Sequence, residues 1–216
     1  MKRPVRTYLS PKNLTIMGVP KKFHDVCIED FLTYKQKDLV KVRDYIQDYL
    51  NRLPEVFDNN EGLFLYGSNG VGKTFIACMI VKEAYRRRYT SRRVTFVEYI
   101  SAYTRMWGAR TPDEKELLEQ EFYNNYKAVE FLVIEEIGKE IDSKVAAPIL
   151  EDCLRYREDH GLVTIICTNL DIQEMKERYG ASSYSLMQGN MTPVLIEGKD
   201  KRREFYSDRL EDNNVL

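Results

Sequence analysis

Residues 62–84 read GLFLYGSNGVGKTFIACMIVKEA and carry the clearest structural pattern in the chain. The stretch begins with a short apolar run, passes through closely spaced glycines, and continues as an apolar run long enough for a helix. Its central residues match the pattern G-x-x-x-x-G-K-[ST] in full: Gly67, Ser68, Asn69, Gly70, Val71, Gly72, Lys73 and Thr74. Glycine lets such a loop wrap tightly, so that successive backbone N–H groups point at a phosphate. We therefore expect a strand over 62–66, a phosphate-binding loop, and a helix over 73–87.

The end of this loop predicts the ligands. In the pattern, the lysine reaches the β and γ phosphates of a nucleotide and the following hydroxyl binds Mg²⁺. Lys73 and Thr74 take these positions, and the helix that follows adds a favourable dipole at its N-terminus. The alternative is a chance glycine turn without a binding function, which the flanking strand and helix disfavour. The sequence thus predicts a site for ATP and Mg²⁺.

A second stretch, FLVIEEIGKE at 131–140, looks like the partner of this loop. Carboxylates at the end of a buried parallel strand face the crevice in which α/β sheets bind ligands. We expect Glu135 to hold the magnesium, usually through water, and Glu136 to act as general base toward the attacking water. Because Mg²⁺ demands near-octahedral geometry, a glutamate in place of the usual aspartate predicts slow turnover. The alternative is a pair of solvated acids at a strand end.

A third polar residue, Asn169, ends the apolar stretch TIICTNL at 164–170. If the sheet has the expected order, its amide lies beside the γ-phosphate, where it can orient the water or sense the phosphate. The alternative is an ordinary asparagine in a strand-to-helix turn.

Strands that alternate with helices predict an α/β fold with a parallel sheet. We expect an N-terminal arm with little regular structure over 1–37 and an ATPase domain over 38–216, with its core at about 60–200 and a short C-terminal tail. Pro148 suggests that the helix ending near Asp159 begins close to Ala147. The other expected strands are 93–100, 130–136, 162–169 and 192–198, and the other expected helices are 38–53, one opening at 111–113, and 171–179.

The bulk composition excludes several classes of protein. A net charge of -1 over 216 residues gives no global attraction to nucleic acid or membrane. The apolar runs are shorter than a membrane span, and the basic N-terminus lacks the apolar core of a signal peptide. The four scattered cysteines form no CxxC pair, which argues against a zinc ribbon or a disulfide framework. We expect a reduced, cytoplasmic protein.

Four stretches together carry a family resemblance: VPKKF (19–23), GLFLYGSNGVGKT (62–74), FLVIEEIGKE (131–140) and TIICTNL (164–170). They resemble AAA+ ATPases and, more narrowly, the bacterial and phage replicative helicase loaders of the DnaC/DnaI type. The transposition ATPases of the IstB type are close relatives. The resemblance implies a three-layer P-loop NTPase sandwich with strand order 5-1-4-3-2 and a reduced or absent lid domain. It also implies self-association on ATP binding and contacts with a replicative helicase and single-stranded DNA.

The resemblance further implies an arginine finger that reaches a neighbour's ATP and a sensor arginine near the C-terminus. Arg178 is the clear finger candidate, and Ser185 occupies the other expected arginine position. Arg202 or Arg203 would serve as the sensor.

A basic stretch, YRRRYTSRRV, follows the loop's helix. The residues that would track phosphates of single-stranded DNA are Arg86, Arg87, Arg88, Arg92 and Arg93. Nearby tyrosines could stack bases: Tyr85, Tyr89, Tyr99 and Tyr103. The alternative is a solvated helix end, where basic residues suit the dipole. Phe23 and Phe31 could pack near the adenine or in the core.

Three functions remain open from the sequence. The first is an ATP-dependent helicase loader. The second is a transposition ATPase that prefers duplex DNA, and the third is a degenerate ATPase that binds and blocks a host loader or helicase.

Overall fold

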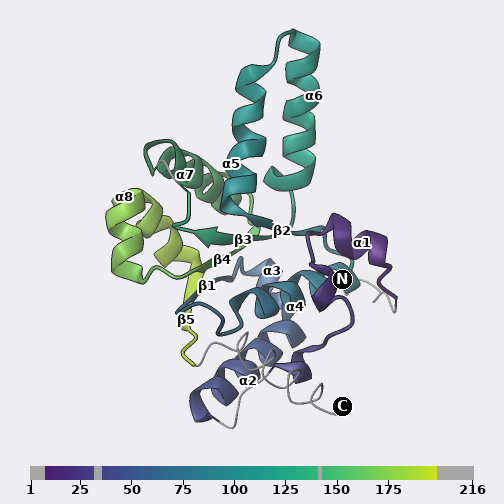
Figure 1. Ribbon diagram of the computed structural model, residues 1–216, viewed down its shortest axis with the longest axis vertical. Coiled ribbons are helices and arrows are strands. Elements are labelled where there is room, and N and C mark those ends of the chain that lie inside the picture. Colours follow the sequence, from purple (N-terminus) through teal and green to yellow (C-terminus); the bar gives the residue numbers. More distant parts are fainter. Residues whose placement is uncertain (1–7, 32–35, 141–142, 199–216) are drawn as a thin grey trace, which may run out of the picture.

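The computed structural model describes residues 8–31, 36–140 and 143–198. One five-stranded sheet organises them, with the order β2-β3-β4-β1-β5 and every neighbouring pair parallel (Figure 1). The strands are β1 (Gly62–Tyr66), β2 (Ser91–Thr95), β3 (Phe131–Ile137), β4 (Val163–Thr168) and β5 (Met191–Leu195). The expected order 5-1-4-3-2 is thereby confirmed.

Helices cover both faces of this sheet, which gives three layers (Figure 1). One face packs against α2, α3 and α4, and the other packs against α5, α7 and α8, so each face has its own buried apolar cluster. The helices are α1 (Pro11–Ile16), α2 (Lys37–Asn51), α3 (Leu53–Asp58), α4 (Lys73–Arg86), α5 (Phe96–Arg105), α6 (Pro112–Phe122), α7 (Ser143–Asp159) and α8 (Ile172–Asn190). Because β1, β3 and β4 are covered on both sides, they are apolar along nearly their whole length.

The strand expected over 93–100 is corrected by the structure. β2 ends at Thr95, and residues 96–100 are the first turns of α5. The Thr95 hydroxyl accepts a hydrogen bond from the Glu98 amide at 3.3 Å, and the Glu98 carboxylate accepts one from the Thr95 amide at 2.9 Å. This capping box begins a helix directly after the strand, which apolar residues alone did not reveal.

Three other element boundaries differ from expectation by three residues or more. α7 begins at Ser143, so Pro148 lies inside the helix and not near its start. α8 continues to Asn190, although Gly180 has a φ of 87° and interrupts its helical conformation. β5 ends at Leu195, three residues before the expected end.

The described part of the N-terminal segment, residues 8–31, is packed against the domain more closely than an arm would be. It contains α1 and two short 3-10 turns, Lys21–Phe23 and Ile28–Asp30. Its buried side chains join the cluster around α4: Leu14, Met17, Val19, Ile28 and Phe31. Their spacing follows no single helical or strand period along the segment, so this packing could not be predicted from periodicity.

The pair α5–α6 extends away from the sheet as a hairpin (Figure 1). Trp107, in the short connection between the two helices, is 66% exposed. Within the described ranges, none of the helices combines the length and the apolar character needed to cross a membrane.

Candidate nucleotide-binding site

The loop between β1 and α4 has the backbone of a phosphate-binding loop. Gly67, Gly70 and Gly72 have φ values of 136°, 78° and 112°, which side-chain-bearing residues rarely adopt. At Gly67 an added Cβ would lie 2.2 Å from the carbonyl oxygen of Ile196, so no larger residue fits there. Gly72 is the N-cap of α4, so the last N–H groups of the loop lie at the positive end of the helix dipole.

Lys73 and Asn169 meet at this loop. The Lys73 ammonium donates to the carbonyl oxygens of Gly67 and Ser68, both at 2.7 Å, and to Asn169 Oδ1 at 2.8 Å. The Asn169 amide donates in turn to Asn69 Oδ1 at 2.9 Å. Because β4 is the parallel neighbour of β1, the carboxyl ends of both strands open at the same edge. The structure thus brings Asn169 into contact with the loop, as the strand order predicted.

Glu135 is buried at the end of β3, with 1% of its surface exposed. Burial raises the pKa of its carboxyl group, while the Arg93 guanidinium and the Thr74 hydroxyl oppose that rise. Arg93 forms an ion pair with it. Neither carboxylate oxygen has a hydrogen bond of ordinary geometry from the described residues. An incompletely satisfied, buried carboxylate oxygen beside Thr74 fits the outer coordination of a Mg²⁺ ion, which binds few protein ligands and keeps several waters.

Glu136 lies in a different environment from its neighbour. Its φ is 60°, and the pairing of β3 with β4 shifts register between Glu135 and Ile137, which is the signature of a β-bulge. The Glu136 side chain is 47% exposed and forms an ion pair with Lys139 at 2.7 Å. The bulge therefore places the two adjacent acids in different environments: Glu135 is buried beside Thr74, and Glu136 is half-exposed to solvent.

Arg178 lies outside the cluster at the loop. Its guanidinium donates to Glu140 Oε1 at 3.0 Å and to the Glu140 carbonyl oxygen at 2.8 Å. The Tyr179 hydroxyl contacts the same carboxylate. These contacts join the segment after β3 to α8. Ser185 is exposed on α8, and Arg202 and Arg203 lie outside the described residues.

The basic stretch divides into surface and interior residues. Arg86 and Arg88 are exposed, and Arg87 pairs with Glu83 at 2.8 Å. Arg92 lies over the Tyr126 ring at 4.6 Å. The expectation that Arg93 contacts DNA is wrong, because its side chain is only 15% exposed and is paired with Glu135. The strand's period of two explains the difference, since adjacent arginines on β2 point to opposite faces.

The aromatic expectations are partly corrected. Tyr89 and Tyr99 are buried in the two apolar clusters, so they cannot stack on bases at the surface. Phe23 and Phe31 both contact Phe75, with ring centroids 6.0 Å and 5.6 Å apart. Phe75 follows Thr74 directly, so these two rings pack beside the start of α4.

Two buried cationic side chains, those of Lys82 and Arg157, could not be predicted from the sequence. Lys82 donates to the carbonyl oxygens of Phe23, His24 and Val26 at 3.0, 2.9 and 2.6 Å, and so fastens the N-terminal segment to α4. Arg157 is 1% exposed and donates to backbone carbonyls before β3 and at the start of β4, including those of Val129 at 2.8 Å and Val163 at 2.7 Å. Burial lowers its pKa to about 10. Both lie in charged helical stretches that look like solvated faces.

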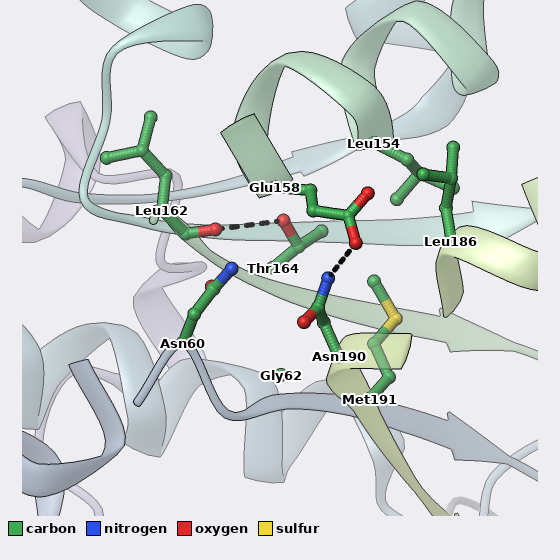
Figure 2. A pocket seen from close by; sticks show the side chains of 9 residues that line it. All are labelled: Asn60, Gly62, Leu154, Glu158, Leu162, Thr164, Leu186, Asn190 and Met191. Carbon is green, nitrogen blue, oxygen red and sulfur yellow. Dashed lines mark hydrogen bonds between the residues drawn. The ribbon is translucent and has the colours of Figure 1, made fainter. Parts of the chain in front are cut away.

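A small pocket lies at the amino ends of β1 and β5, opposite the ends that face the phosphate-binding loop (Figure 2). Gly62, the first residue of β1, lines it, whereas the phosphate-binding loop follows the last residue of that strand. Glu158 accepts a hydrogen bond from Asn190 at 2.8 Å across its wall (Figure 2). The pocket is therefore separate from the nucleotide site.

Comparison with curated proteins finds replicative helicase loaders. The chain is 27% identical over 188 residues to the replicative helicase loader DnaI of Bacillus subtilis, covering 79% of this chain and 58% of that protein. It is 28% identical over 160 residues to the replicative helicase loader DnaC of Escherichia coli, covering 73% of this chain and 60% of that protein. The chain thus spans about three fifths of the length of these relatives.

Comparison with solved structures supports the fold. A crystal structure of the DnaC helicase loader matches with a TM-score of 0.70 at 18% identity, covering 82% of this chain and 100% of that one. A crystal structure of DnaI matches with a TM-score of 0.65 at 21% identity, covering 85% and 94%.

A protein-family model also matches this chain. The model described as IstB-like ATP binding protein matches residues 14–186, a range that contains the phosphate-binding loop, both acids of β3 and Asn169. The chain therefore belongs to the family of IstB-like ATP binding proteins.

Proposed function

We propose that this chain is a replication ATPase of the helicase-loader type, which binds ATP with Mg²⁺ and acts on a replicative helicase and single-stranded DNA. The observation that carries the proposal is the meeting of Lys73, Asn169 and the glycine loop at the edge where β1 and β4 end. The named relatives of this chain are replicative helicase loaders, which supports the choice of partner.

The loop residues would hold the nucleotide's phosphates through backbone N–H groups. Lys73 would exchange its contacts with loop carbonyls and Asn169 for phosphate oxygens, since an ammonium prefers a charged acceptor. Thr74 and Glu135 would hold Mg²⁺, which when bound would neutralise charge on the phosphates. Asn169 would then be free to orient a water or to contact the γ-phosphate.

Glu136 would take a proton from the attacking water. Its exposed position at the bulge suits a base that must meet solvent, although Lys139 holds the carboxylate at 2.7 Å and must release it. This competition supports slow hydrolysis, as does a glutamate at position 135 in place of the usual aspartate. Arg178 would serve as the finger only after leaving Glu140, in an oligomer formed on ATP.

The deciding experiment is light scattering after size exclusion of this protein mixed with the replicative helicase of its own host, in ATP, in ADP and without nucleotide. A stoichiometric complex that depends on nucleotide is the expected result. The Lys73→Ala variant is the matched control and should form no nucleotide-dependent complex. Absence of any complex with the unaltered protein would contradict the loader role.

The description of the matching family favours a second candidate, an IstB-like transposition ATPase. This candidate would bind duplex DNA in preference to single strands. Competition between labelled single-stranded and duplex DNA, in ATP and fixed salt, separates the two candidates. The third candidate, a degenerate ATPase that occupies a host loader or helicase, is separated by measuring ATP binding and hydrolysis. Tight ATP binding with no turnover would favour it.

A further inference from the structure

Arg93 connects the N-terminal segment to the buried acid of the nucleotide site. Its backbone amide donates to the Met17 carbonyl oxygen at 2.8 Å, and its guanidinium donates to the Gly18 carbonyl oxygen at 3.0 Å. The same guanidinium forms the ion pair with Glu135. One side chain therefore contacts both a segment ahead of the core and the predicted magnesium-binding carboxylate.

The contact with the segment is tight. Gly18 has a φ of 77°, and a Cβ at this position would lie 2.1 Å from the Arg93 carbonyl oxygen. Only glycine allows the chain to pass so close to β2. Lys82 holds the next residues of the segment against α4, through the carbonyls of Phe23, His24 and Val26. The segment that contacts Arg93 is thus held against the domain at Gly18 and again at residues 23–26.

The contact with Glu135 meets an electrostatic need. A carboxylate buried without a cation is strongly unfavourable, and a single arginine in ion-pair contact compensates much of that cost. The planar guanidinium also restricts the direction of the carboxylate. Groups that hold a metal ligand in this way affect the metal site strongly, and losing one typically costs about 10–100-fold in metal affinity or activity.

We propose that Arg93 is a positioning residue for magnesium: it holds Glu135 in place beside Thr74 and makes that placement depend on the N-terminal segment. The proposal rests on the proposed binding of Mg²⁺ and ATP at this site. Its consequence is that a partner which moves residues 17–18 would change the Mg²⁺ requirement for nucleotide binding.

The test is a Mg²⁺ titration of a fluorescent ATP analogue bound to the protein, starting in EDTA. The Arg93→Gln variant should need about ten-fold more Mg²⁺ for its half-maximal effect, with each titration referred to the same variant's own affinity in EDTA. Arg93→Lys should give an intermediate value. Arg92→Gln is the matched control, because it removes an arginine from the same strand whose side chain contacts Tyr126 and Asn125 instead, and it should leave the titration unchanged.

The outcomes are distinguishable. An unchanged or lower Mg²⁺ midpoint in folded Arg93→Gln would overturn the positioning role while leaving the nucleotide site intact. Failure of the unaltered protein to bind the analogue would overturn the proposed function itself, and the positioning role with it.

If Arg93→Gln does not fold, hydrogen exchange on the unaltered protein decides the question. Mg²⁺ with nucleotide should change protection of the amides at 17–19 and at Arg93, compared with nucleotide in EDTA. Equal exchange in both conditions would overturn the proposal.

Discussion

Lys73 and Asn169 lie 96 positions apart in the chain and are joined by a hydrogen bond of 2.8 Å. The bond connects the start of α4 to the end of β4, across the edge where the phosphates of a nucleotide would lie. It exists because β1 and β4 are parallel neighbours although they are distant in sequence. A substitution at either residue should therefore change the binding of the nucleotide.

Replacing Lys73 with alanine should remove nucleotide binding. The variant loses an ammonium that donates to the carbonyl oxygens of Gly67 and Ser68 in the phosphate-binding loop. We expect affinity for ATP to fall at least about 100-fold, which corresponds to roughly 2.7 kcal/mol. Titration calorimetry measures it. Lys41→Ala, an exposed lysine of α2, is the control and should bind as the unaltered protein does; retained affinity in Lys73→Ala would contradict the assignment.

Replacing Glu136 with glutamine should separate binding from hydrolysis. The amide keeps the shape of the side chain but cannot accept the water's proton, so ATP affinity should stay within about two-fold while turnover falls at least about 100-fold. Phosphate release under single-turnover conditions measures it. Glu119→Gln, in an exposed ion pair on α6, should leave turnover unchanged. Hydrolysis at the parental rate in Glu136→Gln would place the base elsewhere.

The glycine loop could be predicted because it depends on a local pattern. The position of Asn169 could be predicted once the family resemblance implied the order of the parallel strands. A complete loop pattern between two apolar runs has few other structural solutions. Glu135 and Asn169 lie near the carboxyl ends of neighbouring strands, and the topology alone brings such residues to one edge.

The ion pair of Arg93 with Glu135 could not be predicted in the same way. It depends on which face of β2 carries each arginine, and the expected strand over 93–100 had the wrong start and end. The burial of Lys82 and Arg157 could not be predicted for a related reason. Charged residues in helices are usually solvated, and only the tertiary structure shows which ones donate to buried carbonyls.

Arg157 should be required for stability, because it donates hydrogen bonds to carbonyl groups just before β3 and at the first residue of β4. Arg157→Met would fill most of the space but leave the carbonyls of Val129 and Val163 without this donor, at a cost of about 3 kcal/mol in the free energy of unfolding. Urea denaturation measures it. Arg155→Met, two residues earlier and half-exposed, should cost about 0.5 kcal/mol or less. Equal stability of the two variants would show that the buried guanidinium does not stabilise the fold.

The exposed part of the basic stretch should contribute to binding of single-stranded DNA. Arg86 and Arg88 are exposed at and just beyond the end of α4, where each could neutralise a phosphate and release a counterion. The double change Arg86→Gln with Arg88→Gln should therefore weaken binding and reduce the slope of log affinity against log salt by roughly 1.4. Fluorescence anisotropy of a labelled oligonucleotide at several salt concentrations measures both. Arg43→Gln with Arg105→Gln removes the same charge from α2 and α5 and should preserve the slope, because these arginines lie in exposed ion pairs away from the stretch. If both double variants lower the slope equally, binding follows total charge, and the basic stretch has no special part in it.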